Sequence, residues 1–270
     1  MMYLYPQGKK RALTFSYDDG QKYDRKLVEI FNRYGMKATF HLNSGTLSAS
    51  GDPSDMFVGR NELRELYAGH EVACHGVWHK NLAYQSAQGI LRELAEDRKA
   101  LEQLTGGFVQ GLSYAFGCYS AEVENIARTV GIKYSRTVED TKQFRVPMNF
   151  LEWHPTCHHE DPNLMELGKQ LMNTQDWQEI PLMYVWGHSF EFGNKGNWDL
   201  MEAFCEQMAG NDSIWYATNM EICDYINAVR SLIFSMDGNR VYNPALQTVW
   251  MSQNGKILEC RSGETLDLTK

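Results

Sequence analysis

Short apolar runs alternate with amphipathic stretches along most of the chain. Runs rich in β-branched and aromatic side chains predict β-strands at residues 12–17, 37–42, 71–74, 111–116, 132–138, 180–186 and 214–218. Apolar residues at helical spacing predict helices at residues 22–34, 61–68, 84–105, 120–130, 163–173, 198–209 and 220–232. This alternation predicts an α/β chain with a parallel sheet and helices outside it.

The pattern does not decide whether the sheet is open or closed, because an open doubly wound sheet and a closed barrel both fit it. Neither GxGxxG nor GxxxxGK[ST] occurs, so no motif supports a nucleotide fold. The last residues carry short β-like runs outside the main repeat. We therefore predict a main domain at residues 1–232 and a small C-terminal β extension at residues 233–270.

Composition narrows the range of partners. The chain has 270 residues and a formal net charge of −8, which argues against nucleic acid or an anionic membrane as the main partner. No apolar run is long enough for a membrane span, and the N-terminal residues lack the apolar core of a signal peptide. Six cysteines are scattered without a CxxC pair, which is typical of reduced thiols. We expect no nucleic-acid partner, no membrane span and a cytoplasmic location.

Polar residues follow several predicted strands at the point where each strand ends. Asp18 and Asp19 follow the first strand, His75 follows the third, and His188 follows the strand at residues 180–186. The C-terminal ends of barrel strands are where active sites are built. Two adjacent carboxylates repel each other, so they either sit in a solvated Asp-Gly turn or share a cation.

The segment HGVWH places two histidines four residues apart. If it turns helically, His75 and His79 lie on one face and suit a metal ion; the alternative is two polar residues around a buried Trp78. Gly76 stands where the HExxH glutamate of zinc proteases would be. Two histidines and one carboxylate suit zinc, and also Fe(II), Co(II) or Ni(II). Both aspartates reach such a site only if the strand breaks at residues 17–18.

Three segments together resemble the polysaccharide deacetylases of the NodB-homology type, carbohydrate esterase family 4. TFSYDDG, GHEVACHGVWH and VWGHSFEF are similar to motifs of that family, and their order holds from about residue 10 to residue 230. The resemblance implies a distorted (β/α)7 barrel that hydrolyses an N- or O-acetyl group on a carbohydrate and releases acetate. It implies a divalent metal, usually zinc, held by Asp19, His75 and His79. It further implies that Asp18 is the general base and His188 the general acid.

The third family motif departs from its pattern. Where the family has R-x-P-Y/F, this chain reads LSYAFG, with Ser113 in place of the arginine that pairs with the base. Phe116 matches the aromatic residue whose backbone N–H would serve the oxyanion. We hypothesise that Arg136, at the end of a neighbouring strand, approaches Asp18 instead.

The segment that follows residue 138 is also unusual. It contains Trp153, His154 and His158 in a long irregular stretch whose spacing matches no standard zinc module. We predict that this segment forms a rim of the cleft, where these three side chains stack on or hydrogen-bond to sugar rings. Trp186 and Trp215 are expected in the core.

Two other functions remain as alternatives to the deacetylase. One is hydrolysis of a cyclic amide or imide on the same barrel, as in relatives similar to allantoinase. Those relatives depart from the Asp-His-His set, whereas Asp19, His75 and His79 are all present. The other is a catalytically inactive carbohydrate-binding relative, for which a retained base and acid would have no use.

Overall fold

The computed structural model describes residues 1–175 and 180–269. Its α-helices are α1 (Asp24–Arg33), α2 (Leu63–Leu66), α3 (Ala87–Thr105), α4 (Ala121–Thr129), α5 (Leu164–Met172), α6 (Ser189–Lys195), α7 (Trp198–Met208) and α8 (Asn219–Arg230). Its strands are β1 (Met2–Leu4), β2 (Arg11–Asp18), β3 (Ala38–Leu42), β4 (Glu71–Cys74), β5 (Gly111–Ser113), β6 (Tyr134–Arg136), β7 (Cys157–His158), β8 (Leu182–His188), β9 (Ile214–Tyr216), β10 (Ile233–Phe234), β11 (Arg240–Tyr242), β12 (Val249–Gln253), β13 (Lys256–Cys260) and β14 (Thr265–Asp267).

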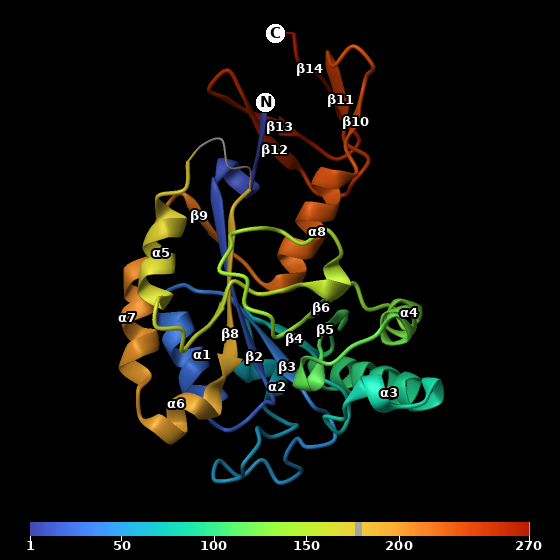
Figure 1. The fold of residues 1–270 in the computed structure, drawn as a ribbon, viewed down its shortest axis with the longest axis vertical. Coiled ribbons are helices and arrows are strands. Elements are labelled where there is room, and N and C mark those ends of the chain that lie inside the picture. Colours follow the sequence, from blue (N-terminus) through green and yellow to red (C-terminus); the bar gives the residue numbers. More distant parts are fainter. Residues whose placement is uncertain (176–179, 270) are drawn as a thin grey trace.

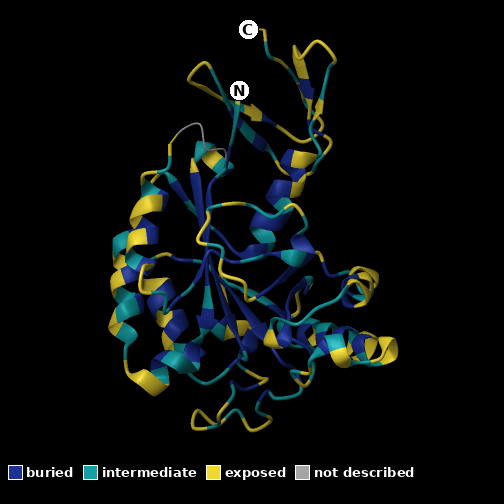
Figure 2. Ribbon diagram, viewed as in Figure 1, coloured by how far each residue is buried: buried dark blue, intermediate teal, exposed yellow. Residues whose placement is uncertain are grey.

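The main sheet is parallel and curls into a half-barrel, which confirms the predicted fold class. Its strand order is β6-β5-β4-β3-β2-β8-β7, and β9 pairs with the start of β2. Helices cover its outer side: α1, α5, α6 and α7 lie on one flank and α3 and α4 on the other (Figure 1). Colouring by burial shows buried strands inside and exposed residues along the outer faces of the helices (Figure 2).

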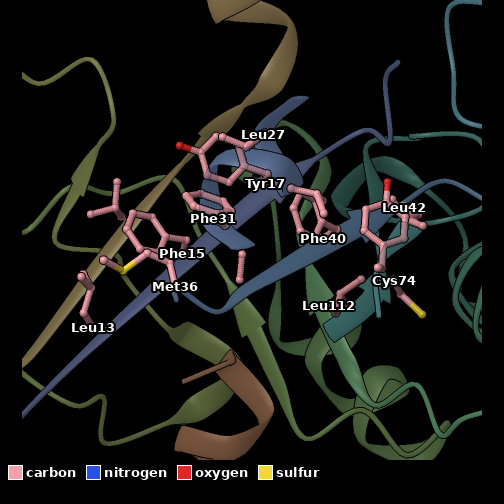
Figure 3. Close-up of a cluster of buried hydrophobic side chains, with 14 of the residues drawn as sticks. Leu13, Phe15, Tyr17, Leu27, Phe31, Met36, Phe40, Leu42, Cys74 and Leu112 are labelled. Atoms are coloured by element: carbon pink, nitrogen blue, oxygen red, sulfur yellow. The ribbon is translucent and has the colours of Figure 1, made fainter. Parts of the chain in front are cut away.

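The central strand β2 shows why the sheet has one apolar and one polar face. Leu13, Phe15 and Tyr17 alternate along it and join the core beneath the helices, together with Phe31 of α1 (Figure 3). The intervening Thr14, Ser16 and Asp18 point the other way, because successive side chains of a strand alternate between its faces. These polar residues are nevertheless buried, so the inner side of the half-barrel is a polar interior.

The helices begin and end where local sequence signals place them. Ser86 and Ser120 accept hydrogen bonds from the first turns of α3 and α4, and Gly106 ends α3 in a left-handed conformation. Thr218 and Glu221 form a capping box at the start of α8. These signals explain why the predicted helices are confirmed to within a few residues.

The strands after α8 lie in two small antiparallel sheets. One has the order β10-β11-β14, and the other has the order β1-β12-β13. The N-terminal strand β1, which the sequence analysis missed, is therefore part of the extension: Tyr3 pairs with Met251. Both termini lie at this end of the molecule, and the loop between β3 and α2 lies at the other (Figure 1). In the described parts of the chain, no helix is both long and apolar enough to cross a bilayer.

Candidate active site at the C-terminal strand ends

The register of the parallel sheet brings the predicted site residues to one level. Asp18 at the end of β2 pairs with His41 of β3 on one side and with His188 of β8 on the other. On the neighbouring strands, Ser113 of β5 pairs with Arg136 of β6. Residues that are far apart in the sequence thus meet at the same edge of the half-barrel.

The chain breaks directly after Asp18, one residue later than the sequence analysis expected. Asp19 has a φ of 80° and Gly20 a φ of 66°, both in the left-handed region. This turn swings the Asp19 side chain to the same side as Asp18, which a continuing strand would not allow. A positive φ at a non-glycine residue costs free energy and is commonly retained at functional sites.

His75 and His79 converge through an irregular turn, not through the helical turn that their spacing suggested. Gly76 has a φ of 81° and His79 a φ of 53°, and the two imidazole rings lie 4.7 Å apart between centroids. Within this turn Trp78 is 58% exposed, so the alternative of a buried tryptophan between two polar residues is wrong.

A buried carboxylate on α3 holds this turn in place. Asp97 Oδ2 accepts hydrogen bonds from the backbone N–H groups of His75 and Gly76, at 3.1 and 3.0 Å, and Oδ1 accepts one from Ser44. Asn43 donates to the carbonyl oxygens of His75 and Gly76. Burial raises the pKa of Asp97 to about 6, although these N–H groups favour its charged form.

Asp19, His75 and His79 form a group that fits a divalent metal. Asp19 Oδ1 lies 3.7 Å from Nε2 of His75 and 3.7 Å from Nε2 of His79. Ligand atoms on a tetrahedral zinc stand about 3.4 Å apart, given zinc–ligand distances of about 2.0–2.1 Å. Nδ1 of His75 lies 2.9 Å from the carbonyl oxygen of Ser113, which can only accept a hydrogen. The hydrogen of neutral His75 is therefore on Nδ1, and the Nε2 lone pair is available to a metal.

Asp18 is held from several sides by donors and positive charge. Arg136 reaches Asp18 Oδ2 from β6, as hypothesised, and its Nε donates to Ser16 Oγ at 3.1 Å. The guanidinium also stacks on the Trp186 ring at 4.5 Å. Burial alone would raise the pKa of Asp18, but Arg136 and the nearby histidines hold that pKa far below its usual range. The carboxylate is therefore ionised and fixed in place.

His188 is paired with a carboxylate that the sequence analysis did not single out. Glu191 Oε2 accepts from the His188 backbone N–H at 3.0 Å and lies 3.3 Å from its Nδ1. Burial lowers the pKa of His188, but the Glu191 hydrogen bond and the Asp18 charge outweigh it, so the net pKa is raised. The only sequence signal for Glu191 was its place three residues after a strand-end histidine, at the start of α6.

A second group, His158, His188 and Glu191, also has ligand-like spacing. The tautomer of His158 argues against a metal there. The backbone N–H of Glu160 donates to His158 Nδ1 at 3.2 Å, so the hydrogen of a neutral ring is on Nε2. That Nε2 lies 3.1 Å from Glu191 Oε2, as expected of an N–H donor and not of a metal ligand. His158 therefore donates to Glu191 and helps to hold the carboxylate that pairs with His188.

One of the predicted sugar-contacting residues lies in the core. Trp153 is fully buried among Tyr134, Phe150 and Tyr184, so the prediction that it stacks on a sugar is wrong. It packs there because the backbone around it pairs with β6. His154 is partly exposed, and its Nδ1 lies 2.7 Å from Thr137 Oγ1, so its contact with a sugar stays a prediction.

Trp186, in contrast, belongs to the site although we expected it in the core. Its indole N–H donates to Asp140 Oδ1 at 2.8 Å, and its ring covers the Arg136 guanidinium. Phe116 is 63% exposed with a φ of 60°, and its ring lies 4.5 Å from that of His79. Trp186, on β8, thus covers Arg136, and Phe116, in the 3-10 turn after β5, lies against His79.

A large hollow lies at the opposite end of the sheet from this site. That hollow has a volume of about 880 Å³ and is lined by residues at the starts of β3 and β4, such as Lys37 and Glu71, and by Trp250 of the extension. Glu71 is already satisfied there by Tyr134 and Thr39. Size alone therefore does not identify the functional site.

Comparisons with known proteins point to the family that the motifs suggested. Residues 6–135, just under half of the chain, match the polysaccharide deacetylase family model. The chain is 27% identical over 135 residues to the peptidoglycan-N-acetylglucosamine deacetylase PgdA of Listeria monocytogenes. The aligned segment covers 50% of this chain and 27% of that protein. The chain spans about a quarter of the length of the curated relatives it matches.

Solved structures with 18% identity share the fold. A Mycobacterium smegmatis protein assigned as a polysaccharide deacetylase has a TM-score of 0.65 over 85% of this chain and 94% of its own. The Xyl-CE4 domain of a multidomain xylanase from the hindgut metagenome of Trinervitermes trinervoides has a TM-score of 0.55, over 82% and 92%. A Bacillus anthracis pseudoenzyme of the CE4 family has a TM-score of 0.51, over 83% and 68%. In its matched residues and in its fold the chain is thus similar to the NodB-type polysaccharide deacetylases that its motifs resemble.

Proposed function

We propose that this chain is a metal-dependent hydrolase that removes an acetyl group from a carbohydrate and releases acetate. One observation carries the proposal: a metal-binding group of Asp19, His75 and His79 lies beside Asp18, whose charge is fixed by the buried Arg136. An ionised carboxylate beside a metal-binding group is placed to take a proton from a water molecule that the metal would bind.

Asp19 Oδ1 and the Nε2 atoms of His75 and His79 would hold the ion. When bound there, a divalent metal, most suitably zinc, polarises the acetyl carbonyl and lowers the pKa of a water molecule. Cobalt, nickel and ferrous iron suit the same donor set of two imidazoles and a carboxylate.

The remaining residues account for the proton transfers. Asp18 accepts a proton from the attacking water as the new C–O bond forms at the acetyl carbon. His188 gives a proton to the departing nitrogen or oxygen as its bond to that carbon breaks, leaving acetate and a free amine or hydroxyl. Because Glu191 engages Nδ1 of His188, Nε2 is the atom that donates.

The relatives suggest which substrates to test. PgdA is named for N-acetylglucosamine units of peptidoglycan, and the Trinervitermes domain belongs to a xylanase. We therefore propose an acetylated glycan and test N-acetylated chito-oligosaccharides beside O-acetylated xylo-oligosaccharides. The xylo-oligosaccharides decide whether an ester is also cleaved.

The decisive experiment combines metal analysis of the purified protein with acetate release from both substrates. Bound metal and acetate release that is lost in Asp18→Asn support the proposal. Absence of both metal and acetate would falsify it. Ring opening of a cyclic amide such as allantoin, without acetate release from either glycan, would favour the allantoinase-like alternative.

A catalytically inactive relative is the second candidate, because a CE4 pseudoenzyme shares this fold. Ser113 in place of the motif arginine is the departure that calls for this test, although Arg136 supplies a positive charge to Asp18 from β6. Saturable binding of an acetylated oligosaccharide by metal-loaded protein, with no acetate released, would support this candidate.

A further inference from the structure

Ser113 occupies the position where the family motif would place an arginine, and its hydroxyl has two partners. Ser113 is the last residue of β5 and is fully buried. Its Oγ lies 2.7 Å from Nδ1 of His75 and 3.1 Å from Oδ1 of Asp18. The hydroxyl thus lies between a proposed metal ligand and the proposed base.

The direction of these hydrogen bonds follows from the chemistry of the atoms. His75 Nδ1 carries a hydrogen because it also faces the carbonyl oxygen of Ser113, at 2.9 Å. That N–H is shared between the carbonyl oxygen and Oγ, so the hydroxyl hydrogen is free to point at Asp18. The result is a directed chain in which His75 donates to Ser113 and Ser113 donates to Asp18.

The two oxygens of Asp18 are held by different residues. Oδ2 is held by Arg136, and Oδ1 accepts from Ser113. One donor alone would leave the carboxylate free to rotate about its Cβ–Cγ bond, whereas two donors on different strands fix its plane. His41 Nδ1, at 3.5 Å from Oδ1, is turned toward Ser16 at 3.1 Å and adds little to this restraint.

We propose that Ser113 is a positioning residue that couples His75 to Asp18, while Arg136 supplies the positive charge from the next strand. The inference rests on the proposed function, because it assigns His75 to the metal and Asp18 to the base. A cation at Nε2 of His75 makes its Nδ1–H a stronger donor, which strengthens the chain toward Asp18. The hydroxyl therefore links occupancy of the metal site to the orientation of the base.

The test compares Ser113→Ala with Ser113→Thr, which retains a hydroxyl, and with Ser135→Ala as the matched control. Ser135 is an equally buried serine on β6 whose hydroxyl has no hydrogen-bond partner in the described chain. Ser113→Ala should lower kcat by about 10- to 100-fold, the effect of one hydrogen bond to a charged group, and leave KM within a few-fold. Ser113→Thr should restore most of kcat, and Ser135→Ala should match the wild type.

Two readouts do not depend on turnover. Zinc content should stay at the wild-type value in Ser113→Ala, because the carbonyl oxygen still orients His75. The Nδ1–H proton signal of His75 in NMR spectra should shift on zinc binding, and that shift should shrink in Ser113→Ala.

In an Asp18→Asn background, adding Ser113→Ala should cost no further residual activity, since the base it positions is gone.

Three outcomes overturn the proposal. They are an unchanged kcat in Ser113→Ala, a Ser113→Thr variant as slow as Ser113→Ala, and a His75 proton signal that does not respond to loss of the hydroxyl. If the wild type binds zinc but releases no acetate, the proposed function fails. The proton signal still decides whether Ser113 couples His75 to Asp18.

Discussion

Replacing Arg136 by methionine should destabilise the fold in a strongly pH-dependent way. The guanidinium is fully buried and contacts Asp18 Oδ2, Ser16 Oγ and the carbonyl oxygen of Thr137. Methionine keeps much of the aliphatic stem but removes the charge and every donor. Asp18, which is 3% exposed, then remains buried without its counter-charge.

The expected loss of stability is large compared with that of an exposed ion pair. Removing one partner of a buried pair typically costs about 3–5 kcal/mol. A domain has about 5–15 kcal/mol of unfolding free energy in total. The variant should therefore fold, but with a clearly lower midpoint of urea denaturation.

The sign of the pH dependence follows from Asp18. In the wild type its folded pKa is depressed, so its charge stabilises the fold above the unfolded pKa of about 3.9 and this contribution is lost as the pH falls. In the variant, burial dominates and the pKa of Asp18 is raised, so stability is lost as the pH rises through that value. The difference in unfolding free energy should be smallest near about pH 3 and largest above about pH 6.

Urea denaturation followed by circular dichroism across this pH range measures the difference directly. The double variant Asp18→Asn/Arg136→Met is the control, because it has no buried carboxylate. At neutral pH it should be more stable than Arg136→Met alone. A difference between wild type and Arg136→Met that stays constant from acid to neutral pH would refute the reasoning.

The remaining predictions concern other parts of the site. Glu191→Gln removes the charge that raises the pKa of His188, so the alkaline limb of the kcat/KM profile, where protonated His188 is lost, should move to lower pH. Asp19→Ala should lose bound zinc by elemental analysis, whereas Asp18→Asn should keep zinc and lose acetate release; identical behaviour contradicts the division of roles. Trp153→Ala should cost about 3–5 kcal/mol in urea denaturation without raising KM, because the ring is core and not a sugar contact.

The predictable part of this fold is the part governed by local periodicity. Along β2, the alternation of Leu13, Phe15 and Tyr17 with polar residues defines both faces of the strand before any partner is known. Parallel strands then require their C-terminal ends to meet at one edge. This is why Asp18 and His188 were expected together, and why the structure places them in register.

Residues whose position depends on long-range packing were not predictable in the same way. Strand β7 is two residues long and owes its place to pairing with β8, which no local pattern reveals. Trp153 was expected at the rim because it lies in a long irregular segment, but it is buried by aromatic rings from β6 and β8. The error for Trp186 was the opposite one. It was expected in the core but lies at the site, because it covers Arg136 of the distant strand β6.

The arginine shows most clearly what a linear motif omits. A motif records the order of residues along one strand, whereas the pKa and orientation of Asp18 depend on where positive charge lies in three dimensions. Ser113 and Arg136 are register partners on adjacent strands, so an arginine moved from one to the other stays at the same level of the half-barrel. The long side chain of Arg136 reaches Asp18 from β6, one strand beyond β5. The short side chain of Ser113 places its hydroxyl between Asp18 and His75. Loss of the motif arginine is therefore not by itself evidence of lost activity, because the charge requirement of the base is met from β6.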